Sequence, residues 1–235
     1  MRELFEQFDA KARARLRERI DAGHAVVLPD AFPAEVAQQA HDELDAAASW
    51  KRYQASSPFF HYQHHNIYDD ALLPPFVRSL KACFAGTAAK RFAAEIGGCD
   101  CSGPLDFGAS WYQPGDHSLP HQDFGLGRSV AWVWNLTQTW DPSWGGCFFW
   151  CPSGISVVPR LNSLILFRVT PRSAHFVTTV APEAGGKRLA LNGWWTTAEA
   201  LTTGVPAGDG DPMLGHAGYG DARRERIGEH DAIVL

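Results

Sequence analysis

Apolar residues in the first half of the chain recur every three or four positions, which is the spacing of amphipathic helices. The clearest case runs from Leu4 to Ile20, and Gly23 follows it as a stop signal. Proline opens the next two helical segments, and the last of them ends at Gly97 and Gly98. The pattern predicts helices over residues 4–20, 33–47 and 75–96, and a short strand over 24–28.

From Phe107 onward the pattern changes to short segments rich in Val, Trp, Phe and Thr, separated by Gly, Pro, Asp and Ser. Strands are predicted over 107–113, 129–139, 146–151, 155–158, 163–169, 174–180 and 187–196. Many short strands without interleaved helices indicate an antiparallel sandwich or barrel, with the leading helices packed on its outer face. The segment after Gly204 is rich in Gly, Pro and Asp, and is interpreted as a mobile lid or a loose terminus.

The predicted strand over 129–139 has one bulky and one small face. The bulky face carries Val130, Trp132, Trp134, Leu136 and Trp140, and the small face carries Ser129, Ala131, Val133, Asn135 and Thr137. Small side chains that face a lumen leave space for a ligand. Because the same small face could pack under a helix, the pattern leaves both arrangements open.

A chain of 235 residues that is 45% hydrophobic can bury a sizeable core within one domain. We expect a single domain with a helix-rich support region over 1–106, a β core over 107–200 and a C-terminal tail or lid over 201–235. The formal net charge of -5 and the absence of a Lys/Arg-rich block argue against nucleic acid as a partner. Composition carries no signal for the oligomeric state.

The N-terminal segment has no uninterrupted apolar run, so neither a signal peptide nor a membrane span is expected there. Five cysteines without an export signal favour reduced thiols over a disulfide framework. Together these features predict a cytoplasmic protein without a membrane partner.

His121 and Asp123 stand two positions apart, which on an extended segment directs both side chains to the same face. His175 lies in a later strand-like stretch that antiparallel folding can bring alongside the first pair. Two imidazoles and one carboxylate leave coordination positions open, as in non-haem iron(II) oxygenases, whereas zinc more often takes a closed tetrahedral site or three ligands plus water. The triplet alone is weak evidence, since many histidines are structural.

The predicted strand over 187–196 places four residues on one face by the period of two, namely Arg188, Ala190, Asn192 and Trp194. Inside a barrel this face would offer a cation, an amide and an aromatic wall. A buried arginine needs an anionic partner, and a dicarboxylate ligand supplies one in bidentate geometry. The alternatives are an internal ion pair or an exposed strand edge for Arg188.

These motifs resemble the 2-oxoglutarate/iron(II) oxygenase superfamily, and within it the prolyl hydroxylase branch, over about residues 107–196. Tyr112, the Pro-Gly-Asp turn at 114–116 and His121-x-Asp123 are similar to that branch's entry to the metal. WDPSWGG resembles its turn between core strands, LILFRVTPRSAHFV its distal-histidine unit, and the stretch from Arg188 to Trp195 its arginine-initiated strand.

The resemblance implies a mainly β fold, a double-stranded β-helix of the jelly-roll, cupin-like kind preceded by N-terminal helices. It implies Fe(II) bound by His121, Asp123 and His175, 2-oxoglutarate as co-substrate on Arg188, and ascorbate as a candidate reductant. Tyr112, Asn192 and Trp194 are further candidates for co-substrate binding. The implied reaction is O2-dependent hydroxylation of an amino acid or amino-acid residue, a prolyl residue included, with decarboxylation to succinate and CO2; the Asp123 carboxylate favours hydroxylation over halogenation.

One position departs from the prolyl hydroxylase pattern. Those enzymes usually carry a tyrosine on the strand after the metal pair that helps to hold the 5-carboxylate, and alignment from Arg128 places Asn135 there. Asparagine can donate a hydrogen bond but reaches less far. Either another donor contributes or the co-substrate sits differently, so Asn135 is kept as a candidate co-substrate residue.

Two classes of function remain open: a hydroxylase that acts on a small molecule or on a protein or peptide residue, and a non-catalytic jelly-roll module that holds a metal or senses a ligand. In a third possibility the helical first half recruits the protein that the barrel modifies. The substrate itself cannot be identified from sequence patterns.

Four histidines and two arginines are weighed separately. His61, His64 and His65 suit a substrate-contacting or solvent-facing segment better than a second metal site, and His117 is interpreted as a turn or rim residue. Arg168 and Arg172 are candidates for binding an acidic substrate group at the opening.

The cysteine spacings do not match a zinc site. The four later cysteines form the patterns CxC (Cys99, Cys101) and CxxxC (Cys147, Cys151), both of which depart from the CxxC spacing of zinc sites. Cys147 and Cys151 are interpreted as small apolar residues.

Overall fold

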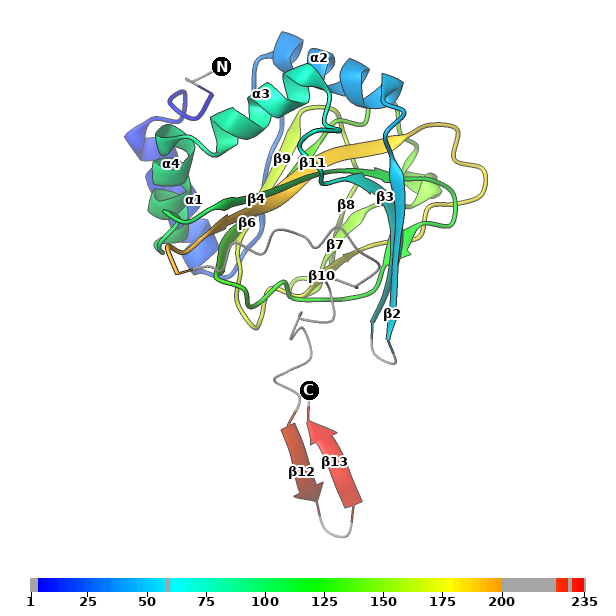
Figure 1. Cartoon of the computed structure of the whole chain (residues 1–235). Coiled ribbons are helices and arrows are strands. Elements are labelled where there is room, and N and C mark those ends of the chain that lie inside the picture. The colour runs from blue at the N-terminus through cyan, green and yellow to red at the C-terminus, as the bar shows by residue number, and fades with distance from the viewer. Residues whose placement is uncertain (1–3, 58–59, 200–222, 228–229, 235) are drawn as a thin grey trace.

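A layer of helices covers one face of an eight-stranded sheet, and a three-stranded sheet lies against the other face (Figure 1). The computed structural model describes residues 4–57, 60–199, 223–227 and 230–234. All strand pairs are antiparallel in the described residues, as the sequence patterns predict. The order of the large sheet is β1-β9-β6-β11-β4-β3-β2, with β5 paired to β3.

The helices are α1 (Ala10–Asp21), α2 (Ala34–Ala46), α3 (Pro75–Phe84) and α4 (Thr87–Gly97). The large sheet consists of β1 (Val26–Leu28), β2 (Lys51–Ser57), β3 (Phe60–Ile67), β4 (Leu105–Tyr112), β5 (His117–Ser118), β6 (Arg128–Asn135), β9 (Ser163–Arg168) and β11 (Arg188–Thr196). The small sheet consists of β7 (Phe148–Trp150), β8 (Ile155–Val157) and β10 (His175–Val177).

The expected single helix over 75–96 is wrong, because the chain forms two helices there. Ala85 ends α3, and Gly86 adopts an extended conformation (φ -71°, ψ 160°) from which α4 begins. Glycine is a poor helix former, so the break at Gly86 costs little. At the other end of α4, Gly98 adopts a left-handed conformation (φ 57°), which confirms the predicted stop.

The two faces of β6 pack against different layers. Trp132 and Trp134 belong to the core beneath the helices, where both rings contact Phe84. Ala131 and Val133 lie on the opposite face, toward the small sheet. The small face therefore looks into the space between the sheets, which decides the question that the sequence pattern left open.

The strands of the second half of the chain lie where the patterns predict them, with ends that differ by a few residues. The patterns do not predict β2, because Lys51, Arg52 and Gln54 interrupt any apolar alternation. It pairs along its length with β3, which carries the histidine-rich segment, and forms an edge of the large sheet.

The division into three regions stays an expectation. Most of the expected tail or lid over 201–235 lies outside the described residues, where only the antiparallel pair β12 (Arg223–Ile227) and β13 (His230–Val234) is described. No helix in the described part of the chain is long and apolar enough to cross a membrane.

Replacing Phe84 with alanine should lower the free energy of unfolding by about 3–5 kcal/mol, because it leaves a cavity among fully buried aromatic rings. Urea unfolding measures the loss. Phe124→Ala is the matched control, since that ring is 41% exposed and its loss should change stability by less than about 0.5 kcal/mol. Equal losses in the two variants would contradict this account of the core.

Candidate functional site

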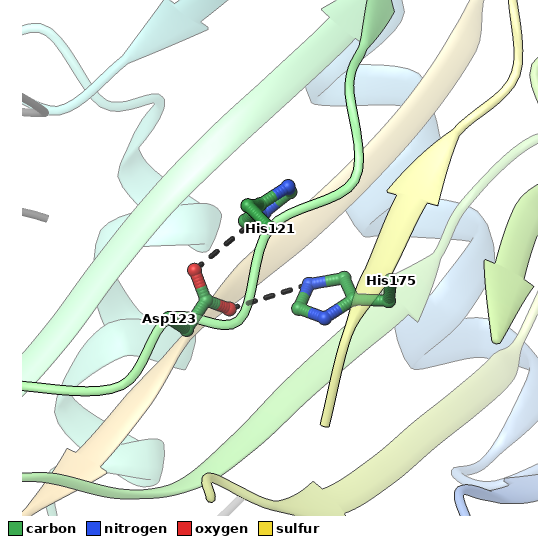
Figure 2. Close-up of side chains that lie close together, drawn as sticks. All are labelled: His121, Asp123 and His175. Carbon is green, nitrogen blue, oxygen red and sulfur yellow. Dashed lines mark ion pairs between the residues drawn. The ribbon is translucent and has the colours of Figure 1, made fainter. Parts of the chain in front are cut away.

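Two histidines and one aspartate meet between the two sheets, at an isolated backbone bridge between His121 and His175. The His121 N–H donates to the His175 carbonyl at 2.9 Å, and the His175 N–H donates back at 2.8 Å. Figure 2 shows Asp123 facing both rings, with Oδ2 at 3.3 Å from His175 Nε2 and Oδ1 at 3.6 Å from His121 Nε2. One ligand atom from each residue lies within 4.8 Å of the other two, so a single ion can contact all three.

The expectation of an extended segment is wrong at Asp123. This residue has φ 55°, and Gly125, Leu126 and Gly127 after it also have positive φ. Aspartate tolerates the left-handed conformation better than most residues. The carboxylate thus reaches the histidines because the chain turns there, and not because residues alternate along a strand.

Hydrogen bonds orient both imidazoles for metal binding. The Nδ1 atom of His121 bonds the Leu119 carbonyl, and that of His175 bonds the Ser173 carbonyl, each at 2.9 Å. A carbonyl only accepts, so each Nδ1 carries a hydrogen, and the Nε2 atom of each ring is the one that faces Asp123. Burial lowers the pKa of His121 to about 4, which leaves this ring neutral and ready to ligate at pH 7.

Asp123 has further partners behind the triad. Burial opposes its ionised form, but the histidines and Arg128 hold the pKa of this carboxyl below its usual range. The Trp194 Nε1–H donates to Oδ2 at 3.1 Å, and Arg128 Nη1 lies 3.8 Å from Oδ1. The Arg128 guanidinium also stacks 3.6 Å above the Trp194 ring and pairs with Asp106 at 3.0 Å. Such outer partners fix the orientation of a metal ligand.

Trp194 therefore contacts a metal-ligand candidate directly, and Arg128 is a site residue that the sequence patterns missed. Arg128 was visible in the sequence only as the first residue of a strand. Its stacking on a tryptophan of another strand depends on the register of β6 against β11.

The triad lines a pocket that extends between the sheets toward Arg188. Of the sequence candidates, Tyr112, Asn192 and Trp194 line the same pocket. Further wall residues that the patterns did not single out include Tyr62, Tyr68, Phe148 and Phe167.

Arg188 is a buried cation without an anionic partner in the described part of the chain. Its side chain is only 2% exposed, which excludes the exposed strand edge. Nε donates to the Gly146 carbonyl at 3.0 Å, and the guanidinium lies 4.8 Å from the centre of the Tyr112 ring. Burial lowers the pKa of this guanidinium, and no described carboxylate forms an ion pair with it. A buried cation in a pocket calls for an anionic ligand.

His64 lies on the other side of Tyr112 from Arg188. Strand β4 runs between β11 and β3, Arg188 pairs with Tyr112, and the register that pairs His65 with Trp111 sets His64 opposite Tyr112. The His64 ring stacks on Tyr112 at 4.9 Å and 8°. Its Nδ1 is buried without a hydrogen-bond partner among the described residues, and burial followed by Arg188 lowers the pKa of His64 to about 3. This wall of the pocket is therefore neutral at pH 7.

Other sequence candidates lie away from the pocket wall. Asn135 does not line the pocket, because its amide donates to Ser163 Oγ at 3.2 Å at the end of β6. His61 Nδ1 lies 2.9 Å from His117 Nε2, and the described residues contain no metal-ligand cluster besides the triad. Arg168 lies 3.9 Å from Asp21.

Known proteins are similar to this chain. The 2OG-Fe(II) oxygenase superfamily matches residues 107–196. Prolyl 3-hydroxylase OGFOD1 from Mus musculus is 30% identical over 115 residues, which cover 45% of this chain and 21% of that protein. The match thus spans about a fifth of the length of this curated relative.

Solved structures show the same fold. A prolyl-4-hydroxylase from Pseudomonas putida aligns with a TM-score of 0.58 and 23% identity, over 77% of this chain and 98% of that one. A prolyl hydroxylase from Trichoplax adhaerens, in complex with a hypoxia inducible factor peptide fragment, aligns with a TM-score of 0.59 and 16% identity, over 79% and 91%. These likenesses bear out the expected double-stranded β-helix.

Replacing Trp194 with phenylalanine should weaken Mn²⁺ binding by about 10- to 100-fold, because it removes the hydrogen bond to Asp123 Oδ2 and keeps an aromatic ring under Arg128. Isothermal titration calorimetry measures the affinity. Trp50→Phe is the control, since the Trp50 indole does not line the pocket. Unchanged affinity in Trp194→Phe would show that this hydrogen bond does not support the metal.

The His64 environment predicts a pH-dependent stability. The pKa of His64 in the folded chain is about 3, which lies below the ordinary value of 6.5. Below pH 6.5, His64 therefore binds a proton in the unfolded chain but stays neutral in the native state. Wild type should therefore lose stability relative to His64→Phe as pH falls from 6.5 toward 3, by up to about 1.4 kcal/mol per pH unit. Urea unfolding across this window tests it, with the exposed His24→Phe as control. Parallel profiles for wild type and His64→Phe would refute the prediction.

Proposed function

We propose that this chain, which matches the 2OG-Fe(II) oxygenase superfamily over residues 107–196, hydroxylates an amino-acid residue, and that a prolyl residue of a peptide or protein is its substrate. In this proposal His121, Asp123 and His175 hold Fe(II). Arg188 binds the 5-carboxylate of 2-oxoglutarate, while Tyr112, Asn192 and Trp194 form the surrounding wall. Iron and 2-oxoglutarate together supply the activation of O2, with succinate and CO2 as co-products.

The observation that carries this proposal is the unpaired Arg188 in the same pocket as the triad. A dicarboxylate placed there would bring one carboxylate to the guanidinium and direct the other end toward the metal ligands. A bidentate contact between guanidinium and carboxylate is strong and specific in a buried site. A module that held its metal only structurally would have no use for this unpaired cation, which weighs against the non-catalytic alternative.

The chemistry of the pocket wall supports an uncharged substrate group. The metal would neutralise the charge of Asp123, and the co-substrate would neutralise that of Arg188. The rest of the wall consists of aromatic, small and neutral polar residues. Tyr62, Tyr68 and Trp194 suit the flat, apolar ring of proline better than a charged side chain. The two prolyl hydroxylase structures and the curated prolyl 3-hydroxylase support the same substrate class.

Ascorbate is proposed only as an external reductant. It needs no site on the chain, and omitting it from the turnover assay tests its contribution.

Replacing Arg188 with leucine should weaken 2-oxoglutarate binding to the Mn²⁺-loaded protein by about 2–5 kcal/mol, because one partner of a buried charge pair is removed. Calorimetry gives the affinity, and succinate release with Fe(II) gives the activity. The exposed Arg91→Leu is the matched control. Retained binding in Arg188→Leu, or equal losses in both variants, would exclude Arg188 as the anchor.

The substrate class is tested with peptide libraries, in which proline-containing peptides should gain a single oxygen atom and their Pro→Ala counterparts should not. The gain should require O2 and 2-oxoglutarate and should disappear in His121→Ala, which lacks one metal ligand. Mass spectrometry detects the product. If only small molecules were oxidised, the prolyl assignment would be wrong. Metal binding without any 2-oxoglutarate turnover would favour the non-catalytic module.

A further inference from the structure

The histidine-rich strand β3 presents its side chains alternately to the two sides of the large sheet. His61 and His65 lie on one side and have partners there. His61 Nδ1 is 2.9 Å from His117 Nε2. His65 Nδ1 is 3.4 Å from Asp116 Oδ2. His64 lies on the other side, and it is the one histidine of this strand that lines the pocket.

The described chain leaves the hydrogen-bonding capacity of His64 unused. Its side chain is buried, and Nδ1 is fully enclosed without a hydrogen-bond partner among the described residues. Because an enclosed N–H without an acceptor costs free energy, the neutral ring keeps its hydrogen on Nε2, the nitrogen that is not enclosed. His64 therefore offers the pocket an uncharged N–H donor.

Aromatic rings hold the imidazole in place. The Tyr112 ring stacks on it with centres 4.9 Å apart and planes 8° apart, and the Tyr62 ring lies 5.4 Å away. On the neighbouring strand β2, Tyr53 pairs with His64, and its ring centre is 6.2 Å from the imidazole. A side chain packed in this way loses little further freedom when a ligand binds, so the donor is preorganised.

Tyr112 separates His64 from the co-substrate anchor. The Arg188 guanidinium lies 4.8 Å from the centre of the Tyr112 ring, and the imidazole packs on that ring from the next strand. A carboxylate that binds the guanidinium in a bidentate contact therefore leaves the imidazole to another ligand group. Since His64 is a neutral donor, an uncharged acceptor such as an amide carbonyl suits it.

We propose that His64 donates a hydrogen bond from Nε2 to the amide carbonyl that precedes the prolyl ring of the substrate. This inference rests on the proposed function. The amide nitrogen of a prolyl residue carries no hydrogen, so the peptide bond before it offers only a carbonyl oxygen. Free proline has a charged amino group there, which donates and cannot accept. His64 thus selects proline within a peptide over the free amino acid.

The ligand side of this contact is tested with wild type alone, loaded with Mn²⁺ and 2-oxoglutarate so that binding is measured without turnover. The probe is the proline-containing library peptide that binds most tightly. Its thioamide analogue carries sulfur in place of the carbonyl oxygen before proline, and sulfur is a poorer acceptor. Calorimetry should show about tenfold weaker binding for the thioamide, and free proline should bind more weakly still.

Variants test the protein side. His64→Phe keeps an aromatic ring against Tyr112 and removes the donor, so it should weaken binding of the peptide about tenfold and that of the thioamide much less. The affinities for Mn²⁺ and 2-oxoglutarate should stay at the wild-type values. His64→Gln retains an N–H donor and should recover part of the loss, and the exposed His24→Phe is the control.

Two results would overturn the proposal: wild type that binds the thioamide as tightly as the amide, or His64→Phe that loses the same affinity for both ligands, as a purely structural role would produce. The thioamide comparison needs no variant, so it stands even if His64→Phe fails to fold. Peptide binding that depends on His64 without any oxygen gain would refute prolyl hydroxylation and leave the contact intact. A loaded wild type that binds no proline peptide would refute both.

Discussion

The site depends on one backbone interaction, the pair of reciprocal hydrogen bonds between His121 and His175. These bonds join the loop that leaves β5, on the large sheet, to the first residue of β10, on the small sheet. Side chains alone could not hold two imidazoles from opposite sheets with their centres 4.4 Å apart. The helical layer packs on one face of β6, and the small sheet packs on the other.

Two opposite charges organise the pocket that the bridge creates. Asp123 already has two partners, Trp194 and Arg128, and it also faces the two imidazoles. Arg188 has only a carbonyl and an aromatic face as described partners. Burying an unpaired charge such as that of Arg188 costs free energy, and an anionic ligand would offset this cost. One pocket thus contains the three metal-ligand candidates and an unpaired cation.

Much of this arrangement could be predicted from spacing, because ligand types and strand order are local properties of the sequence. His121, Asp123, His175 and Arg188 were all identifiable in this way, and the structure brings them to one pocket. The left-handed turn at Asp123 could not be predicted, because the glycines after the triplet indicate a turn but not which residue takes positive φ. Arg128 was missed because its contacts come from another strand.

Asn135 shows a different limit. The strand position was assigned correctly, and its side chain lies on the same small face as Ala131 and Val133, but the end of the strand turns its amide to Ser163. A pattern of alternation says which face a residue occupies, not how far along the pocket its side chain reaches.

The walls of the pocket come from two parts of the chain with different origins. The triad, Arg188 and Trp194 lie within the stretch that matches the superfamily, whereas Tyr62, His64 and Tyr68 come before it, from β3 and the residue after it. The β3 wall is a stack of aromatic rings beside Tyr112. The segment before residue 107 thus supplies a wall of the same pocket that the triad and Arg188 line.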